Sequence, residues 1–269
     1  MALPEITDRA TWLAARTDLL EGEKALTRAR DALNAKRRQL PMVEVTDAGY
    51  RFVGPRGEVP LLALFEGRRQ LIVYHFMFQP DWDEGCPSCS SGAVEVAQGF
   101  LDHLHDRDTT YVYSSRAPYD KLAAWKAHLG HPVPHYSTVG DAFNLDLGVT
   151  FDAADRPVSY NYRSAAAWAE HGWDWFSDED RMPFDLHGHS VFLRDGDRVF
   201  HTYSMYGRGA ETVGGSYYYL DLTALGRQED WEEPADRTDA TRGADPSFGG
   251  DPAHEQALSE ADANDGGAR

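Results

Sequence analysis

Hydrophobic positions along the chain first recur at helical spacing and then gather into short runs. Between residues 8 and 38, leucines recur at roughly helical spacing among paired charges, which predicts one helix or two. We interpret this segment as a solvated helix laid against the domain, with an arm for homodimerisation as the alternative. From Tyr50 to Phe65, around the turn that begins at Gly54, the pattern predicts a hairpin or a strand followed by a short helix.

Strand-like and helical patterns then alternate. The run from Gln70 to Phe78 is continuously apolar and rich in β-branched and aromatic residues, which is typical of a buried strand. A helical pattern extends from Ser88 to about His105, and Thr109–Ser115 is a second strand-like run. A second helix is expected from Pro118 to near Gly130. The order strand, helix, strand, helix predicts a parallel sheet.

The second half of the sequence has a less regular pattern. Residues 132–185 contain many aromatic residues but no clean period. A hairpin follows, because the strand-like runs on either side of Asp195 are joined by an Asp-Gly turn signal. We therefore expect an N-terminal helical extension at 1–48 and a domain at 49–229 with an aromatic-rich insertion at about 132–185.

Composition and charge indicate a C-terminal tail and disfavour two classes of binding partner. Residues 230–269 hold eleven acidic and three basic residues with few large apolar ones, so we expect a disordered acidic tail. The 269 residues carry a net charge of −18, which disfavours binding to nucleic acids and to anionic membranes. The chain has no apolar run near 18 residues and no signal-peptide pattern. We expect a cytoplasmic protein with no membrane partner.

The two cysteines of the sequence, Cys86 and Cys89, form one C-x-x-C motif, which indicates redox or metal chemistry. Cys86 stands at the start of a predicted helix, with Pro87 at the first helical position. The free N–H groups and the helix dipole would favour a thiolate on Cys86. Cys89, one turn later, is close enough to attack a mixed disulfide. We therefore assign Cys86 as the nucleophile and Cys89 as the resolving thiol.

A strand, a C-x-x-C motif at a helix start, a second strand and helix, and a final hairpin are arranged as in a thioredoxin-like fold. The aromatic residues Tyr160, Tyr162, Trp173 and Trp175 could form a wall over the cysteines that selects a substrate, or a satellite core under a long loop. An insertion of this size would hinder a large protein disulfide, which favours a small-molecule substrate or reductant. Arg116, after the second strand, could serve an anion or be a surface residue.

A metal site is the alternative to a dithiol site, which needs no cofactor. His189 stands just before the first strand of the predicted hairpin, where the thioredoxin fold places a loop facing the cysteines. Cys86, Cys89 and His189 would form a soft ligand set for copper or zinc. This set resembles that of the Sco-type copper-delivering proteins, although their motif has three residues between the cysteines. A peroxiredoxin-type peroxidase is disfavoured, because Asp83 stands where its usual threonine would be.

Several motifs together resemble the domain-of-unknown-function 899 family of bacterial thioredoxin-like proteins, over roughly residues 8–228. These are Tyr74-His-Phe-Met-Phe78, Pro80-Asp-Trp82, Gly85-Cys-Pro-Ser-Cys-Ser90, Ser115-Arg-Ala-Pro118, Phe200-His-Thr-Tyr-Ser204 and Arg208-Gly209. Met205 and Gly207 stand where we would expect Thr and Ala. The resemblance implies a thioredoxin-like fold and an unassigned thiol or metal enzyme.

Three functions therefore remain open from the sequence. The leading hypothesis is a thioredoxin-like oxidoreductase that works through Cys86 and Cys89. The second is a protein that binds copper or zinc, or a copper-dependent enzyme. The third is a non-catalytic binding module that retains the fold.

Overall fold

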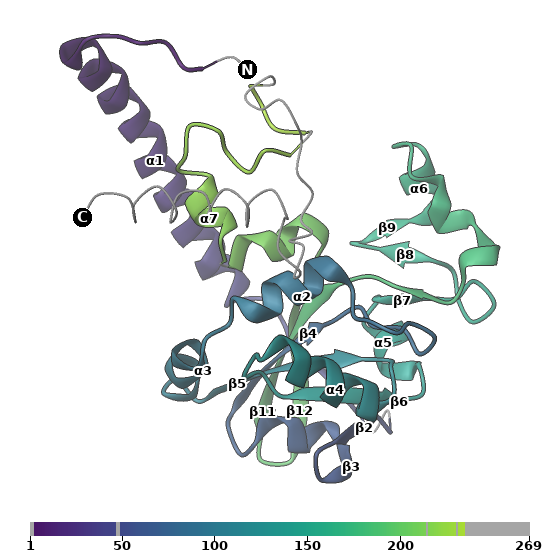
Figure 1. Cartoon of the computed structure of the whole chain (residues 1–269). Coiled ribbons are helices and arrows are strands. Elements are labelled where there is room, and N and C mark those ends of the chain that lie inside the picture. The colour runs from purple at the N-terminus through teal and green to yellow at the C-terminus, as the bar shows by residue number, and fades with distance from the viewer. Residues whose placement is uncertain (1–2, 47–48, 214, 230, 235–269) are drawn as a thin grey trace, which may run out of the picture.

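A computed structural model describes residues 3–46, 49–213, 215–229 and 231–234, and its centre is an eight-stranded sheet (Figure 1). In spatial order the strands are β1 (Val43–Glu44), β12 (Arg198–Tyr206), β11 (Gly188–Asp195), β4 (Gln70–His75), β5 (Thr109–Ser115), β6 (His135–Val139), β2 (Arg51–Gly54) and β3 (Gly57–Pro60). The strands β4 and β5 run parallel, as predicted, and β6, which was not predicted, lies parallel to β5. The neighbours β11 and β2 are antiparallel to β4 and β6.

Helices cover both faces of this sheet. The main ones are α2 (Pro87–Val94), α3 (Gln98–His105) and α4 (Tyr119–Leu129) on one face, and the 3₁₀ helix η1 (Leu61–Phe65) with α5 (Ala142–Asp146) on the other. Alternate residues of β4 serve the two faces, because successive side chains of a strand point in opposite directions. Leu71 and Val73 pack under η1 and α5, whereas Ile72 and Tyr74 face α2 to α4.

The helical pattern predicted from 88 to 105 as one element is two helices. The helix α2 ends at Val94, and α3 begins at Gln98. The break lets α3 turn so that Leu101 is buried in the same cluster as Tyr111 of β5. Both helices are needed to cover this face of the sheet, so packing overrides the continuous periodicity of the sequence.

The segment predicted as an insertion at about 132–185 begins with a strand of the central sheet, since β6 pairs with β5 and β2. The remainder forms small elements over an aromatic cluster of its own, around Phe151 and Phe176. These elements are β7 (Thr150–Phe151), β8 (Ser159–Tyr160), β9 (Arg163–Ser164), α6 (Ala165–Ala169), η2 (Asp174–Ser177), η3 (Glu179–Arg181) and β10 (Phe184–Asp185). The pairs β7–β10 and β8–β9 form two separate two-stranded sheets.

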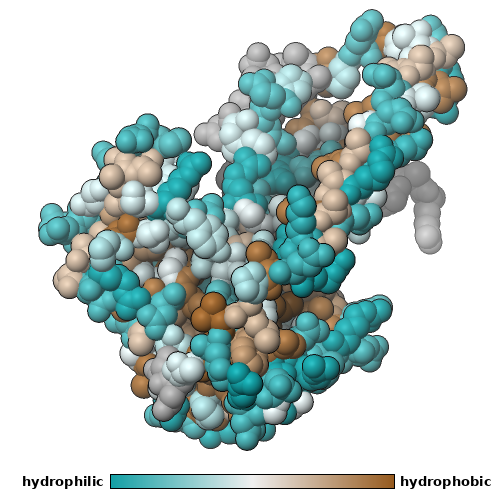
Figure 2. All heavy atoms as spheres, turned by 180° about the vertical axis from the view of Figure 1, so that it is seen from behind, coloured by the Kyte–Doolittle hydropathy of each residue, from teal (hydrophilic) through white to brown (hydrophobic). Residues whose placement is uncertain are grey.

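The N-terminal extension is one helix, α1 (Arg9–Arg37), which begins at the N-cap residue Asp8. It projects from the body, and none of its residues is buried (Figures 1 and 2). Its C-terminal half contacts the end of the domain, where Arg30 donates a hydrogen bond to the hydroxyl of Tyr218 at 3.3 Å. Among the described residues, no helix is both long and apolar enough to cross a membrane.

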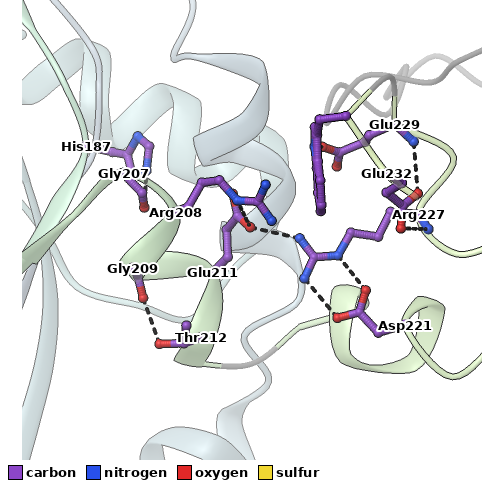
Figure 3. Close-up of polar contacts among 11 residues, drawn as sticks. His187, Gly207, Arg208, Gly209, Glu211, Thr212, Asp221, Arg227, Glu229 and Glu232 are labelled. Carbon is purple, nitrogen blue, oxygen red and sulfur yellow. Dashed lines mark hydrogen bonds and ion pairs between the residues drawn. The ribbon is translucent and has the colours of Figure 1, made fainter. Parts of the chain in front are cut away.

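The last described segment is held by ion pairs. It contains η4 (Gly207–Val213) and α7 (Tyr217–Leu220). Arg227 bridges these two elements through Glu211 and Asp221, with both nitrogen–oxygen distances at 2.8 Å (Figure 3). Of the predicted disordered tail at 230–269, all residues but 231–234 lie outside the described part of the chain.

Candidate functional site

The cysteine motif lies where the loop after β4 enters α2. Cys86 is the N-cap residue of α2 and Pro87 takes the first helical position. The backbone N–H of Cys86 donates to the carbonyl oxygen of Met77 at 2.9 Å, which fixes the loop to the end of β4. The carbonyl oxygen of Cys86 accepts the N–H of Ser90 at 2.9 Å. The Cys86 side chain therefore stands at the positive end of the α2 dipole.

The two thiols have different surroundings. Cys86 is half-buried, whereas Cys89 is buried and accepts a hydrogen bond from the Tyr74 hydroxyl at 3.2 Å. A hydrogen bond to Cys86, together with burial and the charge on Cys86, raises the pKa of Cys89 well above its usual value, and the Tyr74 bond opposes that rise. Cys89 thus holds its proton while Cys86 is the more accessible sulfur, as expected for a resolving thiol and a nucleophile.

The approach to Cys86 requires a glycine at position 85. A Cβ on Gly85 would lie 2.6 Å from a ring carbon of Phe76 and 2.7 Å from Nε1 of Trp125. The loop is also tied to α4, because the ammonium group of Lys121 donates to the carbonyl oxygen of Trp82 at 2.8 Å. Contacts with α4 therefore hold the loop before Cys86 in place.

His189 lies on the same face of the sheet as the cysteines. It pairs with Tyr74 in the β11–β4 register, and the two rings are 4.7 Å apart. Its Nε2 is 3.3 Å from the hydroxyl of Tyr111, and within the described residues its Nδ1 has no partner. Burial and, to a smaller extent, the charge of His187 together lower the pKa of His189 to about 3. His189 is therefore neutral at physiological pH. Tyr74 contacts both this histidine and Cys89.

In the described part of the chain, no group of three His, Cys, Asp or Glu side chains is placed to hold a metal ion. Cys86, Cys89 and His189 therefore do not form a ligand set as they lie. The binding of copper or zinc therefore stays a prediction.

Arg116 is an ion-pair partner in the interior. Its side chain is almost fully buried, and its Nε lies 2.8 and 3.0 Å from the two carboxylate oxygens of Asp185. Its Nη1 is 3.3 Å from Asp141, and Asp185 also accepts a hydrogen bond from Thr150 at 2.6 Å. Arg116 thus joins the end of β5 to the insertion, and Asp185 balances its charge. Arg116 also lines the cavity beside the cysteine loop, so its role as a substrate-pocket residue stays a prediction.

The structure describes the side chains of three of the four aromatic candidates of the insertion. Tyr160 is buried in the cluster of the insertion, donating to the carbonyl of His187 at 3.2 Å and accepting the N–H of Gly207 at 2.7 Å. Tyr162 is 77% exposed, and Trp173, also exposed, lies against Trp168 with its ring tilted by 32° and the ring centroids 5.3 Å apart. The side chain of Trp175 lies outside the described part of the structure. For Tyr160, the satellite core is therefore the alternative that the structure supports.

A cavity of about 680 Å³ lies between the loop before Cys86 and the insertion. Met77 and Trp82 form one side, and Met182, Pro183 and Leu186 form the other. Met77 and Trp82 pack in the same cluster as Cys86, so the cavity adjoins the cysteine loop. The sequence reasoning missed these side chains, although Trp82 stands only four residues before Cys86 in the sequence.

Comparison with known protein families assigns the chain. The family model described as "Bacterial protein of unknown function (DUF899)" matches residues 1–245. The chain belongs to the DUF899 family. None of the curated proteins matches the sequence. Membership in DUF899 confirms the resemblance seen in the motifs and names no reaction.

Solved structures with a similar fold are peroxiredoxins of low sequence identity. Peroxidoxin BcpB of Mycobacterium tuberculosis is 12% identical, with 64% of this chain and 92% of that chain covered and a TM-score of 0.41. A PrxQ mutant of Xylella fastidiosa is 11% identical, and the match covers 65% of this chain and 91% of that chain with a TM-score of 0.39. A yeast mitochondrial 1-Cys peroxiredoxin is 14% identical, and the match covers 64% of this chain and 70% of that chain with a TM-score of 0.31. These likenesses are remote, and the thioredoxin-like fold is evident from the chain's own topology, in which parallel β4, β5 and β6 lie beside the antiparallel strands β11 and β12.

Proposed function

We propose that this DUF899 protein is a dithiol oxidoreductase that reduces a small-molecule disulfide through Cys86 and Cys89. The observation that carries the proposal is the asymmetry of the two thiols. Cys86 is half-buried at the N-terminus of α2, and Cys89 is buried and hydrogen-bonded by Tyr74. An accessible sulfur at a helix N-terminus beside a buried second thiol suits attack followed by resolution.

The reaction has two exchange steps. The Cys86 thiolate attacks one sulfur of a disulfide R–S–S–R, which forms a mixed disulfide and releases one RS⁻. Cys89 then loses its proton and attacks the Cys86 sulfur, so that the Cys86–Cys89 disulfide forms and the second RS⁻ leaves. The two thiol protons pass to the two RS⁻ products. The protein loses two electrons and the substrate gains two, and a low-molecular-weight thiol reductant restores the dithiol by the reverse exchanges.

The cavity beside the cysteine loop supports a small substrate. Its volume of about 680 Å³ is within the usual range for ligand pockets. Its walls combine the apolar side chains of Met77, Trp82 and Leu186 with the polar groups of Gln79 and Asp81. One wall belongs to the insertion, which limits how closely a second protein can approach along this side of Cys86.

Two single variants test the proposal. Reduced protein is mixed with an excess of oxidised glutathione, quenched by alkylation and weighed by mass spectrometry. The wild type should pass through a glutathione adduct to an internal disulfide, Cys89→Ser should stop at the adduct on Cys86, and Cys86→Ser should form neither. Activity that survives in Cys86→Ser would refute the dithiol mechanism and favour a binding module.

Elemental analysis separates the metal alternative from the dithiol. The protein is purified after growth with copper and zinc, beside Cys86→Ser and His189→Ala. Under our proposal the wild type carries no stoichiometric metal, and His189→Ala shifts the reduction potential but leaves turnover measurable. One metal per chain in the wild type, lost in both variants, would replace the dithiol proposal by a metal site.

A further inference from the structure

The helix α1 carries an apolar stripe that no other part of the described chain covers. It has 29 residues, which corresponds to a length of about 43 Å. Trp12, Leu19, Leu26 and Leu33 recur every seven residues and are 46%, 60%, 70% and 56% exposed. Figure 2 shows the helix standing out from the body, with apolar side chains among hydrophilic ones. Sustained seven-residue spacing of large apolar side chains is typical of helices that pair.

Small residues lie beside the stripe on the same side of the helix. Ala15, Gly22 and Ala29 each follow a large residue of the stripe by three positions, which places them next to it on the helix surface. A Cβ added at Gly22 would meet nothing within 4 Å. Glycine inside a helix costs about 1 kcal/mol relative to alanine, and within the described chain nothing packs closely enough there to require it. The position thus leaves room for a side chain from outside the chain.

We propose that α1 pairs in antiparallel orientation with α1 of a second copy of this chain. In this arrangement each large side chain of the stripe meets a small residue. Leu19 packs against Gly22 of the partner subunit, Leu26 against Ala15 of the partner subunit and Trp12 against Ala29 of the partner subunit. The two-fold axis repeats each contact, so one stripe serves as both halves of the interface.

Charges beside the stripe match this register. Arg16 and Glu23 lie on one flank and form an ion pair within the helix at 2.8 Å. In the antiparallel pair Arg16 lies beside Glu23 of the partner subunit, and the two-fold axis supplies the reciprocal pair. The domain contacts α1 at Arg30 and Arg37, near its C-terminal end. Antiparallel pairing therefore puts the two domains at opposite ends of the helix pair.

Sedimentation velocity of the full reduced chain over a range of concentrations measures the pairing. The wild type should sediment at twice the chain mass of 30.1 kDa, and Leu19→Lys or Leu26→Lys should raise the dimer dissociation constant by about 100-fold or more. The matched control is Leu13→Lys, which changes an exposed leucine off the stripe and should leave the dimer intact. A monomeric wild type at all concentrations, or equal dissociation by Leu13→Lys, would overturn the proposal.

Charge reversal tests the register. Arg16→Glu and Glu23→Arg should each raise the dissociation constant about tenfold, because each places two like-charged pairs in the interface. The double variant should return to within about threefold of the wild type. A double variant that stays as dissociated as either single variant would show that these charges do not face each other.

Cysteine cross-linking tests the orientation in a background that lacks both native cysteines, so its outcome is independent of the dithiol proposal. A mixture of Ala15→Cys and Leu26→Cys chains should form a disulfide-linked dimer on oxidation, whereas Ala15→Cys alone should not. Cross-linking of Ala15→Cys with itself and not with Leu26→Cys would show a parallel pair instead.

Discussion

The hydroxyl of Tyr74 donates a hydrogen bond at 3.2 Å to Sγ of Cys89, the sulfur to which we assign the resolving step. Replacing Tyr74 by Phe removes this donor and keeps the ring that packs against Tyr113 and His189. The bond lowers the pKa of Cys89 against the larger effects that raise it. We therefore expect the Tyr74→Phe variant to retain its fold and to hold the Cys89 proton more tightly.

The expected magnitude follows from the strength of a hydrogen bond to a charged acceptor, about 1.5–3 kcal/mol, which corresponds to a rise of about one to two units in the pKa of Cys89. Each unit lowers the thiolate fraction tenfold, but a more basic thiolate is about threefold more nucleophilic. The resolving step should therefore slow by about three- to tenfold. Attack by Cys86 should keep its rate, because Tyr74 bonds the other sulfur.

An aromatic disulfide with a coloured thiolate product resolves the two steps in a stopped-flow experiment. The first release of colour reports attack by Cys86, and the second reports attack by Cys89 on the mixed disulfide. Tyr111→Phe is the matched control, since the Tyr111 hydroxyl bonds His189 and not a cysteine. A Tyr74→Phe variant with an unchanged second phase, or with only a slower first phase, would refute the role assigned to this hydrogen bond.

Three further predictions concern the surroundings of the site. Asp185→Asn removes the closer of the two carboxylates that pair with the buried Arg116 guanidinium and leaves only the half-exposed Asp141. It should lower the free energy of unfolding by about 3 kcal/mol in urea titrations, and a loss as small as that of an exposed ion pair would contradict this expectation. Gly85→Ala places a Cβ against the side chains of Phe76 and Trp125. The rate of Cys86 alkylation should therefore change, and the free energy of unfolding should fall by about 1–3 kcal/mol. If both the rate and the free energy stay unchanged, the loop accommodates the methyl group without strain. Burial lowers the pKa of three histidines to about 3, namely His75, His135 and His189. Between pH 6.5 and pH 3 the unfolded chain binds protons at these histidines that the folded chain excludes, so stability should rise with pH over this range by up to about 1.4 kcal/mol per unit for each. Replacement of His135 by Gln should reduce the slope of thermal stability against pH, and an identical slope would contradict it.

Elements with local signals were predictable from the sequence. The continuous apolar run predicts the strand β4. The helix α4 is predicted by Pro118 before its first turn and by Gly130 after its last turn, where the glycine adopts a left-handed conformation. The strand β6 was not identified as part of the sheet, because its buried residues are largely polar. His135 bonds Ser115 at 2.9 Å and Ser137 donates to the carbonyl of Ala117 at 2.7 Å. Partners from distant segments make these residues compatible with the interior, and no local pattern reveals them.

In the candidate site, too, features that depend on neighbouring residues were predictable and features that depend on the packing of distant segments were not. The position of Cys86 at the start of α2 depends on a few neighbouring residues, so spacing and Pro87 were sufficient to predict it. The contact between Tyr74 and Cys89 and the ion pair of Arg116 with Asp185 depend on the packing of separate elements. Side-chain chemistry alone suggested an anion site for Arg116, because only the fold brings a carboxylate from 69 residues away to its guanidinium.

The surroundings of His189 bear on two of the three hypotheses that the sequence left open, the dithiol site and the metal site. A ligand histidine must direct a ring nitrogen at the metal that the thiolates hold. In the structure its Nε2 faces the Tyr111 hydroxyl, while its ring packs on Tyr74, whose own hydroxyl bonds Cys89. Ligation through Nε2 would therefore require Tyr111 to give up its contact, whereas Nδ1 has no partner among the described residues. Dithiol exchange requires no such rearrangement, because Cys86 and Cys89 already hydrogen-bond to each other and the neutral His189 adds no charge beside them.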